Sequence, residues 1–187
     1  TSLRPPMARG NPQLLVSVFT AAHEIGEQIG TAFRSLLAQS HQQWEWVVLD
    51  DSSSPSTSEH VAALAESPEA AGRIRLYRQH RPQGSVGLAK RVAAAACRGE
   101  VLVELDHDDE LLPTALEVVA ATFVAHPDVD FVFSDWIDWL DLPGGGAPAT
   151  FPPGWGLGFG AYASEVVGGR RVPVTLAPAL AWETVRH

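Results

Sequence analysis

The 187-residue sequence contains a single cysteine, Cys97, and a single lysine, Lys90. A lone cysteine can form neither an internal disulfide nor a cysteine-ligated metal site, so a reducing compartment is expected. No apolar run approaches the length of about 20 residues that a membrane-spanning helix needs, and the polar residues 1–11 lack the apolar core of a signal peptide. We therefore expect a cytoplasmic protein, and peripheral attachment to the inner face of the membrane stays open.

Positive charge is also scarce, because 13 basic residues face 22 acidic ones and the formal net charge is −9. Non-specific binding to nucleic acid depends on neutralising phosphates, so nucleic acid is not expected as the partner of this chain. Seven of the basic residues nevertheless lie between Arg73 and Arg98, which is compatible with a local anion site. A hydrophobic content of 45% over this length suits one globular domain with a sizeable core.

Apolar runs that predict strands alternate with helical patterns along most of the chain. The expected strands are 14–19, 44–49, 74–77, 101–105 and 130–134. The expected helices are 25–39, 58–66, 84–97 and 113–126, with Gly99 closing the third. This alternation predicts an α/β fold with a doubly wound, mainly parallel sheet, whose ligands bind at the carboxyl ends of the strands.

Three regions are expected from the change in composition along the chain. Residues 1–13 form an N-terminal extension, and 14–135 form the α/β core. Residues 136–187 are rich in glycine, proline and tryptophan and show little periodicity, which indicates a loop-rich region. We expect this region to be the start of a mobile wall that receives a second substrate, in a chain cut from a longer one; a poorly ordered extension is the alternative.

Acidic residues gather directly after the fourth expected strand, at Asp106, Asp108, Asp109 and Glu110. Carboxylates this close raise one another's pKa unless a cation or several backbone donors neutralise them. Magnesium and manganese prefer carboxylate oxygens and keep positions for water and for substrate phosphates. The Asp-x-Asp spacing of the first two therefore predicts a metal shared with a phosphorylated ligand.

The same acidic residues are compatible with other interpretations. A solvated turn that caps the next helix stays open. A calcium loop of the helix-loop-helix type is disfavoured, because Leu111 stands where its sharp turn needs glycine. His23 and His107 are interpreted as hydrogen-bonding or exposed side chains, not as metal ligands.

Four stretches of the chain carry a further pattern: 15–24, 47–53, 87–91 and 99–109. In order and spacing they resemble the motifs of the family 2 glycosyltransferases, GT-A enzymes that move a sugar from a nucleotide-diphosphate donor to an acceptor hydroxyl. The resemblance covers about residues 14–135. It departs from the family at Ser52, where the family has glycine, and at Lys90-Arg91, where it often has Arg-Asn.

The resemblance implies a Rossmann-like GT-A fold, a nucleotide-diphosphate sugar as donor with UDP as the family's usual nucleotide, and inversion at the anomeric carbon. Mn2+ or Mg2+ would be held by Asp106 and Asp108. The residues implied in binding the donor are Thr20, Glu24, Asp50, Asp51, Gly87, Lys90 and Asp106.

Physical chemistry supports some of these roles separately. A carboxylate such as Asp51 can accept the imide N–H of uracil, although capping the serine-rich turn is an equal alternative. Gly87 lets the backbone approach a ligand closely, and the amides at the start of its helix favour phosphate, although a simple turn glycine is the alternative. Lys90, one turn into that helix, is placed to meet a diphosphate.

The transfer reaction also needs a general base, and none is identifiable. Asp135 and Glu183 are candidates only as carboxylates in the second half of the chain, where a saccharide or other hydroxyl acceptor would bind. We expect the 187-residue chain to bind donor but to lack part of the acceptor side.

Three other folds or functions share some of these features. The alternatives to a transferase are a non-catalytic nucleotide- and metal-binding domain of the same shape, or a receiver-like α/β domain. A receiver-like domain would carry its acids on the first and third strands, whereas the acids of this chain follow the second and fourth expected strands. A nicotinamide-binding Rossmann domain is disfavoured because no Gly-x-Gly-x-x-Gly follows the first strand.

Overall fold

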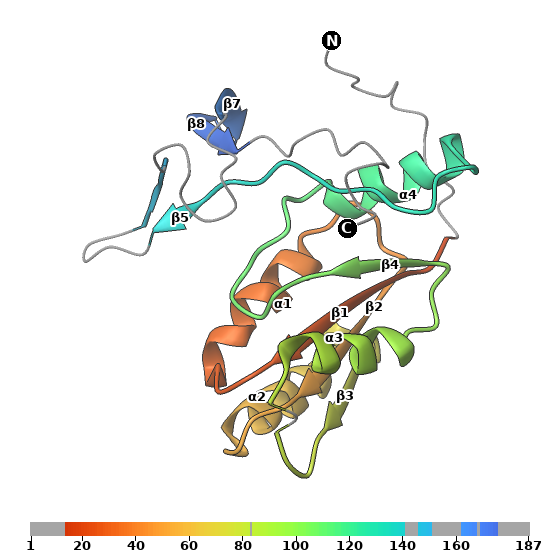
Figure 1. The fold of residues 1–187 in the computed structure, drawn as a ribbon, viewed down its shortest axis with the longest axis vertical. Helices are drawn as coiled ribbons and strands as arrows, with labels where there is room; N and C mark the ends of the chain where they lie inside the picture. The colour runs from red at the N-terminus through yellow and green to blue at the C-terminus, as the bar shows by residue number, and fades with distance from the viewer. Residues whose placement is uncertain (1–13, 83, 141–145, 151–161, 168, 176–187) are drawn as a thin grey trace. The chain divides into compact units, whose positions relative to one another are not determined.

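The computed structural model describes residues 14–82, 84–140, 146–150, 162–167 and 169–175 (Figure 1). The chain divides between Asp130 and Phe131 into two compact units.

The first unit is built around a parallel sheet of four strands in the order β3-β2-β1-β4. The strands are β1 (Val16–Ala22), β2 (Trp44–Asp50), β3 (Ile74–Arg78) and β4 (Val101–Glu104). All three pairings are parallel, so the four carboxyl ends lie at one edge of the sheet. The predicted α/β fold with a mainly parallel sheet is confirmed.

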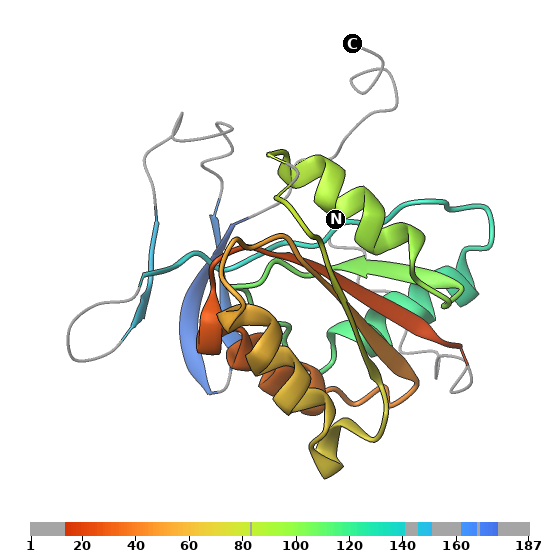
Figure 2. The same cartoon turned by 90° about the horizontal axis from the view of Figure 1, so that it is seen from below.

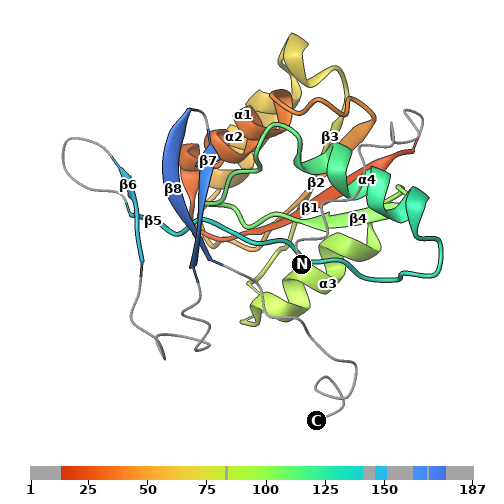
Figure 3. The same cartoon turned by 90° about the horizontal axis from the view of Figure 1, so that it is seen from above.

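Helices cover both faces of this sheet. They are α1 (Gly30–Leu37), which follows the short 3-10 helix η1 (Gly26–Ile29), α2 (Ser56–Ala65), α3 (Val86–Ala95) and α4 (Ala115–Ala125). A second 3-10 turn, η2 (Pro68–Ala70), precedes β3. Figures 2 and 3 show α3 on one face and α1, α2 and α4 on the other.

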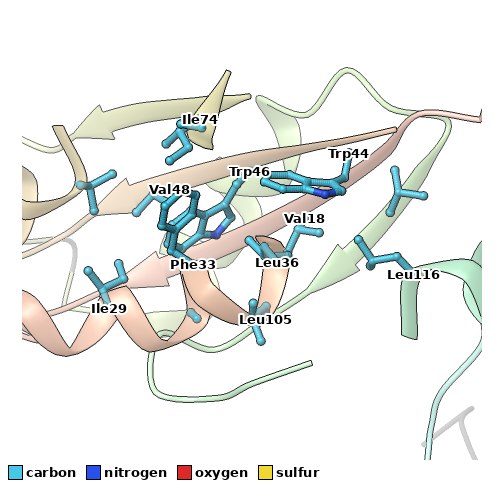
Figure 4. Close-up of a cluster of buried hydrophobic side chains, with 14 of the residues drawn as sticks. Val18, Ile29, Phe33, Leu36, Trp44, Trp46, Val48, Ile74, Leu105 and Leu116 are labelled. Atoms are coloured by element: carbon cyan, nitrogen blue, oxygen red, sulfur yellow. The ribbon is translucent and has the colours of Figure 1, made fainter. Parts of the chain in front are cut away.

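Alternation of side chains along the strands divides the core into two clusters. In β1, Val16 and Val18 face α1, α2 and α4, while Phe19 faces α3. The larger cluster is centred on Trp46, which is fully buried and stacks on Phe33 of α1 with ring centroids 6.0 Å apart and planes at 5° (Figure 4). Because β1 and β2 are covered on both faces, all their residues are buried, which accounts for their near-continuous apolar sequences.

The fifth expected strand, 130–134, is wrong. Residues 131–134 pair with no strand in the part of the chain that the structure describes, and Phe131 and Phe133 are 74% and 49% exposed. The alternating Phe-Val-Phe pattern carries strand propensity. A strand, however, also needs a neighbouring backbone to satisfy its hydrogen bonds, and local sequence does not supply one.

Gly99 also has a different role from the one expected. Helix α3 ends at Ala95 and its C-cap is Ala96, three positions before Gly99. A Cβ at Gly99 would lie 2.6 Å from the carbonyl oxygen of Leu15 and 2.7 Å from the amide nitrogen of Ser17. Glycine is needed here because the backbone entering β4 passes directly against that of β1.

The described residues of the second unit form two antiparallel strand pairs. β5 (Trp139–Leu140) pairs with β6 (Ala147–Pro148), and β7 (Tyr162–Val167) pairs with β8 (Arg170–Thr175). Asp138 accepts a hydrogen bond of 2.6 Å from the hydroxyl of Thr175, which holds the segment before β5 to the end of β8. Among the described residues of the whole chain, no helix is long and apolar enough to cross a membrane.

Candidate functional site

Three loops meet at the carboxyl edge of the parallel sheet: those following β1, β2 and β4. His107, after β4, places Nδ1 3.1 Å from the carbonyl oxygen of Ala21, and His23, after β1, places Nδ1 2.9 Å from that of Asp51. Both histidines therefore make hydrogen bonds between loops, as expected. The parallel topology has brought the acidic residues of two separate motifs to one edge.

Lys90 of α3 meets the acidic residues at the end of β4. Its ammonium nitrogen lies 2.6 Å from Oε1 of Glu104 and 2.7 Å from Oδ1 of Asp106. These two acids are two positions apart, so the period of a strand places both on the face that α3 covers. Burial by itself would lower the pKa of Lys90, but hydrogen bonds and charges of Asp106 and Glu104 outweigh it and raise that pKa.

The rest of the acidic cluster forms a turn after β4. The amide of Asp109 donates to the carbonyl oxygen of Asp106 at 3.1 Å. Desolvation, followed by the charges of Asp108 and Asp106, raises the pKa of the Asp109 carboxyl. The side chain of Asp108 is 69% exposed, with His107 Nε2 4.0 Å from its Oδ1.

Whether these residues suit a divalent metal depends on how many ligands the protein must supply. Among the described residues, no group of three or more His, Cys, Asp or Glu side chains is arranged to hold a metal ion. Mg2+ and Mn2+, however, are often held by one or two carboxylates, with water and substrate phosphates completing the shell. The exposed Asp108 and the neighbouring Asp106 fit that donor set.

The start of α3 is open to an anion. Ser85 caps the helix by accepting a hydrogen bond from the amide of Leu88 at 3.4 Å. A Cβ built on Gly87 would meet no atom of the described residues within 4 Å, so a ligand has room to approach the backbone at this position. Helix N-termini present amide dipoles that favour phosphate, and Lys90 stands one turn further along the same helix.

A depression of about 550 Å³ lies at the carboxyl ends of β2 and β3. Its lining is Ser52, Ser53, Arg78, Gln79, His80, Arg81 and Pro82. Residues 78–82 are not among the predicted donor-binding residues, although Arg78 and Arg81 belong to the basic stretch that was compatible with an anion site. Their position directly after the third expected strand was the available signal, because ligands of such sheets bind at strand ends.

The basic residues between Arg73 and Arg98 do not form one anion site. Arg73 lies over the ring of Trp44, with its guanidinium carbon 3.8 Å from the ring centroid, and Arg75 forms an ion pair of 2.9 Å with Glu45. Both partners belong to the start of β2, far from its carboxyl end. Of the seven basic residues in this stretch, Arg78 and Arg81 are the two that line the depression.

Two of the residues implied in donor binding are buried. Thr20 is 1% exposed, donates to the carbonyl oxygen of Leu105 at 2.7 Å and accepts from Nε1 of Trp46 at 2.9 Å. Asp50 is fully buried and accepts hydrogen bonds from the amide of Ser52 and the hydroxyl of Ser58. Both side chains lie on the α1–α2 face of the sheet and stabilise the fold beneath the site.

Asp51 and Glu24 lie closer to the surface loops. Asp51 is 7% exposed and directly precedes the two serines of the depression. Glu24, with φ of 50°, accepts hydrogen bonds from the amides of Ser53 at 2.7 Å and Ser54 at 3.3 Å. Glu24 therefore joins the loops after β1 and β2 and orders one wall of the depression.

The candidates for the general base belong to the second unit. Asp135 is exposed, and Glu183 lies outside the described residues. Asp135 and Glu183 therefore stay predictions.

A model of the glycosyl transferase family 2 matches residues 17–141. The chain belongs to this family. The predicted family membership is confirmed, and with it the expectation that the chain comes from an enzyme. Among relatives, the O-antigen biosynthesis protein RfbC of Myxococcus xanthus is 32% identical over 157 residues, which are 83% of this chain and 12% of that protein.

Solved structures of glycosyltransferases share the fold. Residues 1–349 of TarS from S. aureus, in complex with UDP-GlcNAc, give a TM-score of 0.54 at 20% identity over 73% of this chain and 38% of that one. The mannosyltransferase PcManGT from Pyrobaculum calidifontis, in complex with GDP-Man and Mn2+, gives 0.50 at 23% identity over 64% and 35%. The GT-A fold expected for this family 2 chain is confirmed, and the chain spans well under half of each of these proteins.

Proposed function

We propose that the first unit binds a nucleotide-diphosphate sugar, with UDP as its nucleotide, for inverting transfer of the sugar to an acceptor hydroxyl. One observation carries the proposal: Lys90, the open start of α3 and the acidic turn of Asp106 and Asp108 lie together at the carboxyl ends of the strands. A cation and helix amides beside carboxylates suit a diphosphate that shares a metal with the protein.

The diphosphate is assigned to the start of α3. Gly87 leaves room for the phosphate oxygens, the first amides of the helix can donate to them, and Lys90 adds a positive charge. These groups stabilise negative charge on the leaving diphosphate without transferring a proton.

Asp106 and Asp108 are proposed as the protein ligands of Mn2+ or Mg2+. A bound divalent ion would supply Lewis-acid stabilisation of the leaving oxygen. The exposure of Asp108 supports this assignment, as does the manganese named with the PcManGT structure.

The nucleoside is assigned to the depression after β2 and β3. Arg78 is held near the sheet by Asp50, with Nε 3.9 Å from Oδ2, and Arg81 lines the same space. Asp51, beside the depression, is the proposed acceptor for the imide N–H of uracil. UDP as the nucleotide is also supported by the donor named with the TarS structure.

The acceptor and the general base complete the proposal. A saccharide or another hydroxyl compound would be deprotonated by a carboxylate on the face of the sugar opposite the diphosphate. Asp135 and Glu183 are the candidates. Single-turnover transfer by the 187-residue chain would show that the acceptor side is complete.

Calorimetric titration with UDP and GDP, with and without Mn2+, tests the proposal. We expect UDP to bind in the presence of Mn2+ and Asp108→Asn to weaken that binding about 10-fold or more, because losing an interaction with a charged group costs about 1.5–3 kcal/mol. Asp128→Asn is the matched control, since Asp128 is an exposed carboxylate in the turn after α4.

Absence of binding by either nucleotide would contradict a donor site. Binding that is unchanged by Asp108→Asn would contradict the metal assignment alone. Donor binding without transfer, in a chain extended to the length of its relatives, would favour the non-catalytic binding domain over the transferase.

A further inference from the structure

Lys90 occupies one carboxylate oxygen of Asp106, which is a proposed metal ligand. Its ammonium lies 2.7 Å from that oxygen and 2.6 Å from Glu104, and its side chain is only 24% exposed. The side chains of Asp106 and Glu104 are 45% and 51% exposed, so the cation is more shielded from solvent than the acids that hold it. Helix α3 covers one face of the sheet (Figure 3), and the two ion pairs of Lys90 show that Glu104 and Asp106 lie toward this helix.

The charges at this point are partly balanced by the protein itself. Two carboxylates and one ammonium leave a net charge of about −1. A divalent cation on Asp106 would meet the ammonium of Lys90 on the same carboxylate, and like charges at such distances repel. Lys90 therefore competes with a metal for Asp106 while it stays in place.

A diphosphate changes that competition. Its oxygens attract the ammonium strongly, and the anion is assigned to the start of α3 at Val86, four residues before Lys90. When Lys90 turns toward the phosphates, Asp106 becomes available. Glu104, which is not expected to bind metal or donor, keeps the lysine near the turn.

We propose that Lys90 is an internal counter-cation of Asp106, held by Glu104, which lowers metal affinity until the diphosphate of the donor draws it away. The inference rests on the proposed function, because it assumes a diphosphate at α3 and a metal at Asp106. It adds a regulation of that site, because the affinity for the divalent metal is low without the donor and rises when the donor binds. The two binding events are therefore coupled through one side chain.

Mn2+ binding without nucleotide tests this role directly. Electron paramagnetic resonance of free Mn2+ gives the dissociation constant for the wild-type chain and its variants. We expect Lys90→Met to tighten Mn2+ binding about 5-fold or more, within the range usual for coupled sites. Lys90→Arg keeps the positive charge beside Asp106 and should leave the affinity close to that of the wild type.

Arg91→Met is the matched control. Arg91 is the next residue of α3 and is exposed, so its loss removes the same charge from the same helix without freeing Asp106. Equal Mn2+ affinities of Lys90→Met and Arg91→Met would overturn the proposal. The loss of one positive charge anywhere on α3 would then explain any increase in Mn2+ affinity. Thermal unfolding of each variant shows that the comparison is made on folded protein.

The only lysine of the chain offers a second readout. Lysine-selective isotope labelling gives a single side-chain signal in nuclear magnetic resonance, and Mg2+ replaces Mn2+ as the diamagnetic probe. We expect UDP with Mg2+ to shift this signal far more than Mg2+ alone. UDP that binds by calorimetry but leaves the signal unmoved would overturn the role of Lys90 and keep the donor site, whereas no UDP binding at all would overturn the proposed function itself.

Discussion

Side chains at the carboxyl ends of β1 and β2 divide between fold and site according to the face on which they lie. Thr20 and Asp50 point to the α1–α2 face and are buried with hydrogen-bond partners. Asp51 follows Asp50 by one position and begins the loop whose serines line the depression. Asp50 therefore stabilises the fold while the adjacent Asp51 is a candidate to contact the donor, because successive side chains along a strand point to opposite faces.

Thr20→Val is expected to destabilise the chain by about 1–3 kcal/mol. The substitution keeps the shape but leaves the carbonyl oxygen of Leu105 and Nε1 of Trp46 without this buried partner. Because Thr20 is 1% exposed, the dissociation constant for UDP should not change. Urea unfolding and calorimetry measure the two effects separately.

Thr114→Val is the control for this comparison. Thr114 precedes α4, is exposed and makes no side-chain capping bond, so the same change should stay within about 0.5 kcal/mol. A large loss of UDP affinity in folded Thr20→Val would show that this hydroxyl contacts the donor after all.

Glu45 makes the stability of the first unit depend on pH. Burial alone would raise the pKa of this carboxyl, but hydrogen bonds from the Ser17 hydroxyl and the Arg98 amide, with the charge and hydrogen bonds of Arg75, lower it. A group whose pKa is lower in the folded state stabilises the fold above its unfolded pKa of about 4.3. That contribution is lost as pH falls through the folded value.

Unfolding free energy should therefore fall below about pH 4.3 more steeply in the wild type than in Glu45→Gln. Glutamine carries no ionisable proton, so this part of the pH dependence disappears, although the variant is less stable at neutral pH. Urea unfolding at a series of pH values from neutral to acid measures both slopes. Parallel curves for the two proteins would contradict the role of Glu45.

At the scale of elements, α3 connects the packing of the sheet with the proposed donor site. Its Ala89 and Ala93 are buried against Phe19, Val47 and Leu49. Its other residues include Gly87 beside open space and Lys90 beside the acids of β4. Small residues on the buried face let the helix lie close enough to the sheet for Lys90 to reach Asp106.

Substitution by alanine should change stability in opposite directions at Gly87, within α3, and at Gly99, which follows it. Gly99→Ala forces a Cβ to 2.6 Å from the backbone of β1, so we expect a loss of about 1–3 kcal/mol or more. Gly87→Ala, within the first turn of α3 and facing open space, should stabilise the helix by about 0.5–1 kcal/mol. Denaturant unfolding of both variants measures these changes.

The same two variants also distinguish an effect on stability from an effect on UDP binding. If phosphate approaches the start of α3, Gly87→Ala weakens UDP binding while the protein becomes more stable. An unchanged affinity would place the diphosphate elsewhere, and a Gly99→Ala variant as stable as the wild type would contradict the close approach of β4 to β1.

For the molecule as a whole, strand pairing differs between the two sides of the boundary at Asp130 and Phe131. β1 and β2 pair along their full length within a covered sheet, whereas 131–134 pair with no strand in the described residues. Backbone amides should reflect this contrast, since protection from exchange depends on hydrogen bonding and burial.

Hydrogen exchange followed by mass spectrometry should show slow exchange for β1 and β2 and fast exchange for residues 131–134. The paired strand β8 serves as an internal reference in the second unit, because it pairs with β7 along six residues. Protection over 131–134 comparable to that of β2 would restore the strand that the sequence pattern predicted.

Sequence alone was sufficient for the α/β class, the four paired strands and the family. Strand and helix periodicity are local properties, and four short motifs in order are specific even when each is weak. The acidic turn after β4 and the lysine of α3 were also visible, because their chemistry follows from residue type. The spacing did not reveal that 78–82 line a depression or that Glu104 shares Lys90 with Asp106.

Tertiary structure decided which side of the backbone each candidate faces and what it meets there. Thr20 and Asp50 are buried, and Lys90 forms ion pairs with two carboxylates. Residues 131–134 pair with no strand among the described residues. Each outcome depends on residues distant in sequence, such as Trp46 for Thr20 and Lys90 for Glu104. Local patterns determine what a segment can form, whereas burial, hydrogen bonding and charge pairing across the fold determine what its side chains do.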